Sequence, residues 1–238
     1  KKFIFALLLL FLMVGCSSPA SIPTPTIEIK SSSTPAIQKT ETVQATDEPL
    51  PVSTASLPAG EMLLKIIPQE STVSYTVNET FLNQNNRFNT AIGSTSEVNG
   101  EIFANPEIPT QSRLGVISVD ISTFKSDNSK RDNMIRKNWL ESLKYPLVTF
   151  VPRSMTGLPD SYVPGQSYTF EVQGELTIRD KTLGSNVTVT ASYDQGQLTG
   201  TAETSFLMSD YGFGPISIAG ILNTEDLVKV KLDFVARP

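Results

Sequence analysis

Apolar and polar residues alternate with a period of two through most of the chain after Gly60. From Val187 to Tyr193 every second residue is apolar, and the turn residues 194–196 separate this run from the next, 197–208. Such alternation is typical of an antiparallel strand with one buried face and one wet face. Eight or nine strands of this kind favour a closed barrel or a sandwich. The other runs that predict strands are 62–67, 72–77, 98–103, 114–121, 147–151, 168–172 and 228–234.

The segment 129–143 has helical periodicity instead. Apolar residues recur at every fourth position from Ile135 to Leu143, which is the spacing of one helix face. Ser129 followed by Asp132 resembles a capping box, and a carboxylate in the first turn suits the positive end of the helix dipole. We therefore expect one short helix whose apolar stripe caps one end of an all-β barrel.

The first sixty residues have a different composition from the rest. Residues 1–15 combine two lysines with an apolar run that is too short to span a bilayer, so they predict a signal peptide. The run ends in Leu-Met-Val-Gly-Cys, which resembles the bacterial lipobox, and Cys16 would then carry the lipid anchor; an ordinary leader with an incidental Cys is the alternative. Half of the residues in 17–60 are Ser, Thr or Pro and none is aromatic, so 16–60 predicts a lipidated, disordered tether. The globular domain is expected over 61–238, held on the extracytoplasmic side of a bacterial membrane, periplasmic or cell-surface.

Composition excludes several classes of function. The chain contains no histidine and one cysteine, so Ser-His-Asp catalysis, Cys-His catalysis and His/Cys zinc sites are not expected. A formal charge of −5 offers no basic footprint for a phosphate backbone, so we expect no nucleic acid partner. Two glutamate pairs, Glu97/Glu101 and Glu171/Glu175, have the even spacing that puts carboxylates on one strand face, and a hydrolase built on them is a minor alternative.

Four segments of the sequence resemble the YceI family of secreted lipid-binding proteins. "RDNMIRKNWLESLKYPLVTF" (131–150) is similar to its Arg-Asp pair, apolar helix, Tyr-Pro and short strand; "ISTFKSDNSKRD" (121–132) is similar to the segment before that helix. "VQGELTIRDKT" (172–182) and "SDYGFG" (209–214) resemble later blocks in the same order. The resemblance implies an extended eight-stranded, lipocalin-like barrel that holds a long-chain lipid, typically a polyisoprenoid. Asn133, Asp180 and the longer, polar segment 78–100 depart from the family pattern.

The residues expected to meet such a ligand fall into two groups. Arg131 and Arg87, the second in a predicted long loop at 78–97, could orient an anionic head group with their planar donor forks; helix capping, an ion pair or a plain surface position are the alternatives. Apolar side chains could line the lipid tunnel or simply fill the core, because the sequence does not fix which strand face points inward. These tunnel candidates are Tyr75, Phe103, Ile135, Trp139, Phe150, Phe170, Tyr193, Phe206 and Phe234.

The leading hypothesis is therefore a membrane-tethered binding protein that sequesters, transports or stores an isoprenoid-like amphiphile in the barrel. It requires no catalytic residue, metal or cofactor, and a homodimer remains open. The alternative is a surface or stress-response module for protein interaction, with a barrel filled by side chains and no lipid ligand.

Overall fold

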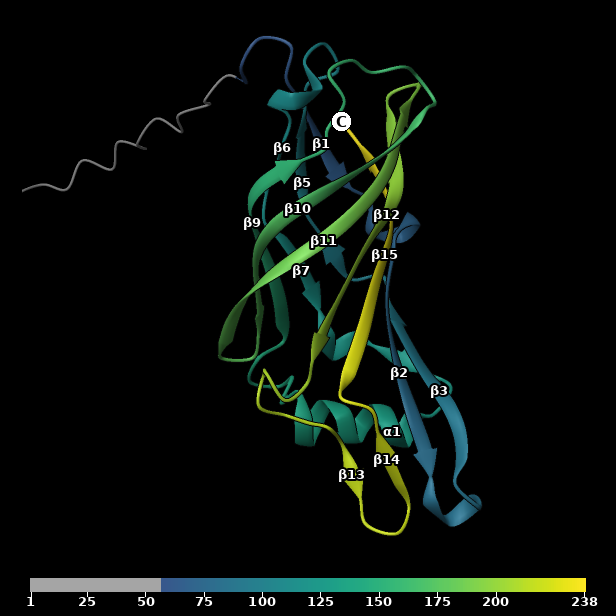
Figure 1. Cartoon of the computed structure of the whole chain (residues 1–238). Helices are drawn as coiled ribbons and strands as arrows, with labels where there is room; N and C mark the ends of the chain where they lie inside the picture. The colour runs from purple at the N-terminus through teal and green to yellow at the C-terminus, as the bar shows by residue number, and fades with distance from the viewer. Residues whose placement is uncertain (1–56) are drawn as a thin grey trace, which may run out of the picture. The chain divides into compact units, whose positions relative to one another are not determined.

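The structure is a computed structural model that describes residues 57–238; the predicted signal peptide, Cys16 and most of the tether lie outside the described residues. Strands dominate the described part of the chain and join into one sheet (Figure 1). The described helices include none that is long and apolar enough to cross a membrane.

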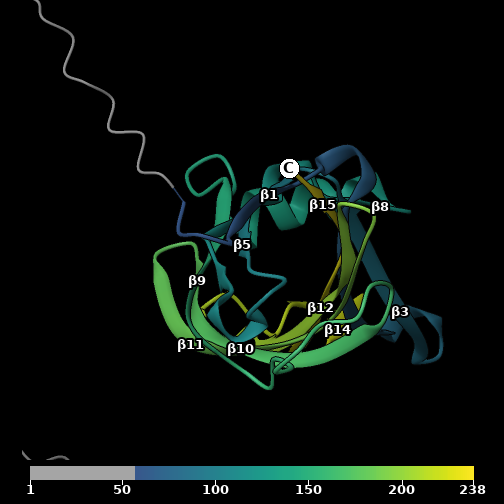
Figure 2. The ribbon, with the colours of Figure 1, turned by 90° about the horizontal axis from the view of Figure 1, so that it is seen from above.

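The sheet closes on itself. Each strand of the ring pairs antiparallel with the next, and the last pairs back with the first, so Figure 2 shows a ring when the molecule is seen from above. Two short segments separated by Gly100 act as one bent strand, which gives eight strands around the barrel and confirms the predicted architecture. In the order of pairing these are β1 (Met62–Ile66), β15 (Leu227–Arg237), β12 (Gln197–Leu207), β11 (Lys181–Asp194), β10 (Ser167–Ile178), β9 (Leu147–Thr156), β7 (Ile117–Asp120) and the bent strand β4 (Val98–Asn99) with β5 (Glu101–Ala104).

The period-two alternation of each strand determines which side chains point into the barrel. On β10 and β11 the inward residues include Val172, Leu176, Val189 and Ala191, which are buried together in one core cluster. Gly174 also faces inward, and a Cβ there would lie 2.4 Å from the ring of Phe150 on β9. The missing side chain therefore allows the Phe150 ring to lie across the inner surface.

The predicted loop at 78–97 is wrong: most of it is a hairpin. β2 (Thr72–Phe81) pairs with β3 (Arg87–Thr95) along its whole length, and only 82–86 connects them, with Asn85 and Asn86 at positive φ. Asn tolerates this backbone region better than most residues. The sequence pattern does not predict this strand, because polar residues such as Asn89 occupy positions where a buried face normally carries apolar side chains.

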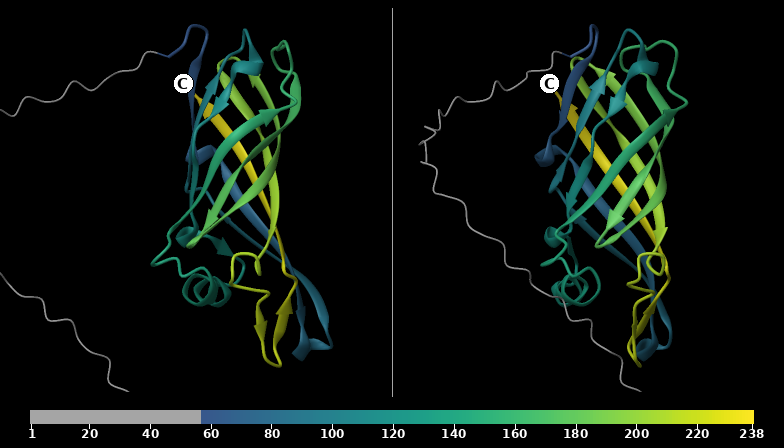
Figure 3. Two further views of the ribbon diagram at one scale, coloured as in Figure 1. Left: turned by 60° about the vertical axis from the view of Figure 1, so that its left-hand side comes forward. Right: turned by 90° about the vertical axis from the view of Figure 1, so that its left-hand side faces the viewer.

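Both β2–β3 and a second, smaller hairpin extend past the lower end of the barrel (Figure 3). That hairpin pairs with β2, and a short strand pairs with β3 at Gly93 and Ser94. The remaining strands are β13 (Ser217–Ile218) and β14 (Leu222–Thr224) of the smaller hairpin, β8 (Lys125–Ser126) beside β3, and β6 (Arg113–Leu114) beside β5.

The predicted helix is present, begins at Ser129 and lies across the lower end, but its capping residue and its end differ from the prediction. α1 (Ser129–Met134) is capped by Asn128, whose side chain accepts from the backbone N–H groups of Lys130 and Arg131, while Asp132 accepts from Ser126. A π-helical turn, Ile135–Trp139, follows, and Glu141 at φ 48° ends the helical segment. The predicted apolar face of the helix therefore does not extend to Leu143, which is 98% exposed.

Aromatic side chains fill the interior above α1. The Phe206 ring packs edge-on against Tyr211 and Phe213, with ring centroids 5.2 Å and 6.4 Å apart. Tyr75 packs in the same manner against Phe124 at 5.3 Å. These aromatic side chains pack against one another at the lower end of the domain.

An ion pair fastens α1 to the projecting hairpin. Arg131 donates to Glu79 on β2 at 3.2 Å and pairs also with Asp127, and Glu79 is 3% exposed. Asn89 on β3 donates to the same Glu79 oxygen at 2.7 Å. The buried carboxylate is thus stabilised from both the helix and the hairpin.

We expect Arg131→Ala to destabilise the domain by about 3–5 kcal/mol, because it leaves the buried Glu79 carboxylate without its cation. Arg153→Ala is the matched control: Arg153 pairs with Glu175 at an exposed position, so its loss should cost about 0–1 kcal/mol. Urea denaturation measures both. Equal losses for the two variants would contradict the assigned role of the buried pair.

Burial raises the pKa of Tyr75 to about 12, an effect that the nearby Arg131 guanidinium partly opposes. In the unfolded chain a tyrosine ionises near pH 10, so between about pH 10 and 12 ionisation favours the unfolded state and stability falls. Between pH 8 and pH 11 the Tyr75→Phe variant should therefore lose about 1 kcal/mol less folding stability than the unmodified domain. Denaturation curves at the two pH values test this, and an unchanged pH dependence in the variant would contradict it.

Candidate functional site

An apolar cavity of about 260 Å³ runs inside the barrel. Inward side chains from β9, β10, β11, β12 and β15 form its wall, among them Phe150, Phe170, Val189, Ala202 and Phe234. None of the described residues that line it carries a charge. Because a charged group without a partner is strongly disfavoured in such surroundings, the wall suits a hydrocarbon chain rather than an ion.

Two loops at the upper end of the barrel complete the cavity. The β9–β10 loop, 157–166, contributes Leu158, Pro159 and Tyr162, and the 105–112 loop contributes Asn105 and Pro109. The polar groups of the lining lie mostly at this end, so an amphiphile would meet hydroxyl and amide groups here and hydrocarbon below. At the opposite end, aromatic side chains pack against one another above α1.

Hydrogen bonds hold the 157–166 loop against the barrel. The Tyr162 hydroxyl donates to the Tyr193 carbonyl at 2.8 Å, and the two rings lie 5.7 Å apart between centroids. The backbone N–H of Gly165 donates to the same carbonyl at 3.0 Å, and that of Val163 donates to the Tyr168 hydroxyl at 3.0 Å. Burial raises the pKa of the Tyr162 hydroxyl.

The 105–112 loop is organised by one buried amide. Asn105 is 4% exposed, and its side-chain oxygen accepts from the backbone N–H groups of Glu107 and Ile108 at 3.1 and 2.9 Å. Its own backbone N–H donates to the Ser112 hydroxyl at 2.9 Å. These bonds give the loop a fixed conformation beside the cavity.

Four of the predicted tunnel residues line the cavity: Phe150, Phe170, Tyr193 and Phe234. The other five lie outside its lining. Tyr75 and Phe206 belong to the aromatic packing at the lower end, and the Arg113 guanidinium covers the Phe103 ring at 3.8 Å. Ile135 and Trp139 lie in the π-helical turn.

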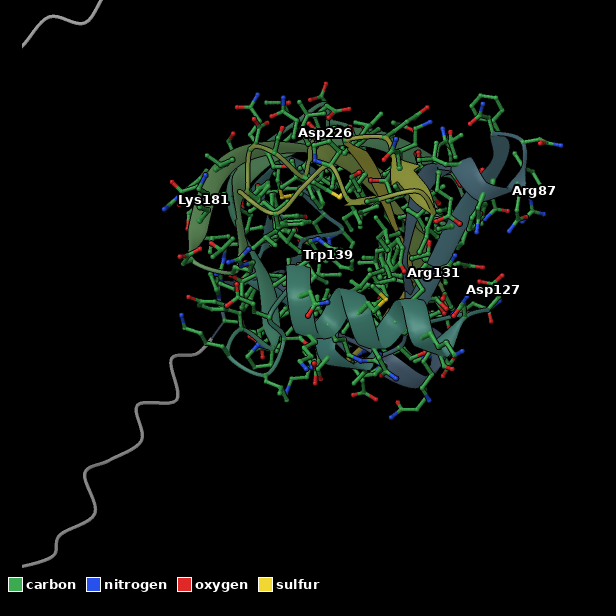
Figure 4. All side chains as sticks on the ribbon, turned by 90° about the horizontal axis from the view of Figure 1, so that it is seen from below. Arg87, Asp127, Arg131, Trp139, Lys181 and Asp226 are labelled. Carbon is green, nitrogen blue, oxygen red and sulfur yellow. The ribbon has the colours of Figure 1, made fainter. Side chains whose placement is uncertain are left out.

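Neither predicted head-group arginine lies at the cavity. Arg131 already pairs with two carboxylates, and the Arg87 guanidinium lies over the Phe81 ring at 5.1 Å. Figure 4, seen from below, places Arg131 on the helix across the lower end and Arg87 out on the projecting hairpin. The cavity loops lie at the other end of the barrel.

The glutamate pair on β10 lies on its outer face. Glu171 accepts from Thr188 at 2.8 Å, and Glu175 accepts from Arg153 at 2.6 Å. Their neighbours Phe170 and Val172 point the other way, into the cavity. The two carboxylates therefore do not share a pocket with the lining.

Sequence reasoning missed the loop residues Asn105, Tyr162 and Tyr168. Asn105-Pro106 is a turn signal, and Tyr162 lies in a Gly- and Pro-rich segment between two strands, so both could have been assigned to loops at a barrel end. Which end carries the cavity depends on tertiary packing, for which these residues give no local signal.

Comparisons with known proteins agree with this architecture. A family model described as a YceI-like domain matches residues 64–236. No curated protein matches the chain.

Two solved structures have the same fold. BcnA of Burkholderia cenocepacia is 20% identical, with a TM-score of 0.56, and the match covers 71% of this chain and 98% of BcnA. A polyisoprenoid-binding domain from Saccharophagus degradans, implicated in plant cell wall breakdown, is 9% identical, with a TM-score of 0.54 and coverage of 73% and 97%. With the family model covering nearly all of the barrel, the chain belongs to the YceI-like family.

Proposed function

We propose that the barrel binds the apolar chain of an isoprenoid-like lipid in its cavity and sequesters, transports or stores it. The observation that carries the proposal is the uncharged apolar cavity enclosed by a closed barrel. The Saccharophagus degradans neighbour, which is named as a polyisoprenoid-binding domain, is consistent with it. Binding of this kind requires no chemical step, so the proposed function is not enzymatic.

The driving force would be burial of hydrocarbon. Each methylene moved from water into such a cavity contributes about 0.8 kcal/mol, so a chain of ten carbons could contribute on the order of 8 kcal/mol before the costs of ordering it. A volume of about 260 Å³ lies just below the range of roughly 300–1,000 Å³ typical of ligand pockets. We therefore expect the cavity to hold a segment of a long chain, with side chains shifting to admit more.

The polar end of the ligand would lie at the upper loops, near Asn105, Tyr162 and Tyr168. These groups offer hydroxyl and amide hydrogen bonds but no charge, whereas Arg87 and Arg131 lie elsewhere. The location outside the cytoplasmic membrane and the lipid anchor at Cys16 remain part of the proposal on sequence grounds alone. A tether there would keep the barrel near a membrane from which a lipid could enter.

The alternative of a protein-interaction module with a solid barrel receives less support, because the cavity leaves room for a ligand. It would gain support if the purified domain contained no lipid and bound none.

Filling the cavity should abolish lipid binding. Ala202 lines the cavity on β12, and Thr201 precedes it on the opposite face of the same strand. We expect Ala202→Trp to lower the lipid recovered from purified protein by at least tenfold, while Thr201→Trp retains it. Mass spectrometry of organic extracts gives the measurement, and circular dichroism verifies that both variants fold. Equal lipid content in both variants would overturn the cavity as the binding site.

Loosening the upper loop should speed ligand release. Tyr162→Phe removes the hydrogen bond to the Tyr193 carbonyl, which is worth about 0.5–1.5 kcal/mol, so we expect dissociation to accelerate roughly two- to tenfold. Stopped-flow dilution of a bound alkyl fluorophore reports the rate. Tyr145→Phe, remote from the cavity lining, is the control. Identical rates in both variants would contradict a role of this loop in ligand exit.

A further inference from the structure

The β2–β3 hairpin carries an open strand edge. β3 pairs with β2 on one side, and on the other side β8 covers only Gly93 and Ser94. Among the described residues, no strand pairs with the outer edge of 88–92. Figures 1 and 3 show this part of β3 at the margin of the molecule, projecting beyond the barrel.

Apolar side chains lie along this same edge. Phe88 is 82% exposed and Ile92 is 55% exposed, and Thr90 lies between them on the same face. Their cross-strand neighbours on β2 are Thr80 and Thr76, which give them no apolar partner. An isolated hairpin would gain from covering both side chains.

The usual protection of an edge strand is missing between Phe88 and Ile92. Natural edges commonly carry Lys, Pro or an inward charge that discourages pairing with another chain. The sequence here is Phe-Asn-Thr-Ala-Ile, with no charge and no proline. Such an edge is a template for a further strand.

The sequence of the edge is complementary to itself. If two copies pair antiparallel with Thr90 opposite Thr90, Phe88 of each copy lies opposite Ile92 of the other. Aromatic with β-branched and Thr with Thr are both favourable cross-strand pairs. All six side chains then lie on one face of the joined sheet, because directly opposite residues of an antiparallel pair share a face.

The charges at the ends of the edge fit this register. Ser126 of β8 already occupies the edge position beside Gly93, so the added strand ends at Phe88 and its residue Arg87 lies next to β8. Arg87 would then approach Asp127 of the second copy, whose side chain is 84% exposed. A two-fold axis creates this opposite-charge approach twice.

From these observations we propose that the free edge of β3 is an isologous interface at which a second copy of this chain adds its own β3, with a two-fold axis at Thr90. The joined hairpins would form one continuous sheet across the dimer and bury Phe88 and Ile92 of both copies. The interface is remote from the cavity lining, so it does not depend on lipid binding.

A cysteine at position 90, on the proposed two-fold axis, tests how the two β3 strands are aligned. The barrel and its core lie within the described residues, which cluster as one compact unit, so the domain from residue 57 onward can be studied alone; it lacks Cys16 and contains no native cysteine. We expect Thr90→Cys to form a disulfide-linked dimer with an added oxidant, because opposite Cα atoms lie about 4.5–5.5 Å apart in an antiparallel pair.

Asn78→Cys is the matched control, since Asn78 lies directly opposite Thr90 on β2. Its two copies would be three strand spacings apart, about 14 Å, which is too far for a disulfide. Non-reducing electrophoresis distinguishes the two variants. Cross-linking of both or of neither would overturn the proposed register.

The unmodified domain gives the second measurement. Its mass by light scattering should rise with concentration towards twice that of the monomer, and Ile92→Lys should weaken the dimer at least tenfold by placing charge on the edge. Leu143→Lys, at the most exposed large apolar residue, is the control and should leave the dimer unchanged. A monomer at all concentrations, or equal effects of the two lysines, would overturn the interface.

Discussion

The fold depends on strand β15, which pairs with two different strands, β1 and β2, along the same edge. Its C-terminal end pairs with β1 at Ala236 and Arg237 and so closes the barrel, while Lys229 to Asp233 pair with β2 and support the projecting hairpin. Between these two stretches Ser71 fills the gap: its buried hydroxyl accepts from the backbone N–H of Val235 at 3.1 Å. An unpaired N–H at this buried fork would be costly, so the side chain makes the division between barrel and hairpin possible.

The two ends of the domain, divided in this way, carry different kinds of side chain. The upper end has the cavity, uncharged loops and the hydrogen bonds of Tyr162. The lower end has packed aromatic rings, the helix and the buried Arg131–Glu79 pair. A ligand chain can therefore be held in the barrel without disturbing the charges that fix the helix, and the hairpin edge is free to meet another molecule.

The sequence indicates the barrel well because its signal is local. Period-two runs such as 187–193 predict strands whose inner faces line the cavity. The turn expected at 194–196 is a two-residue hairpin loop, Gln195-Gly196, with both residues at positive φ. The hairpin at 78–97 escapes such reasoning because the buried Glu79 and the half-buried Asn89 are polar, and Glu79 is stabilised by Arg131 from a distant part of the chain. Long-range ion pairs leave no periodic pattern.

The site was harder to predict than the fold for a related reason. Phe150 and Phe206 have similar alternation in sequence, yet one lines the cavity and the other packs against Tyr211 and Phe213. Arg131 is attractive as an anion ligand until its two carboxylate partners are known. Whether an inward aromatic meets a ligand or another side chain depends on how far each end of the barrel is filled, which is a property of the assembled structure.

The most direct test is the electron density inside crystals of the domain purified without delipidation. The account predicts continuous elongated density in the cavity, from the loop that carries Tyr162 down to Phe150, with any polar end at the loops. Density for ordered waters alone, or side chains closing the space, would contradict a lipid-binding barrel.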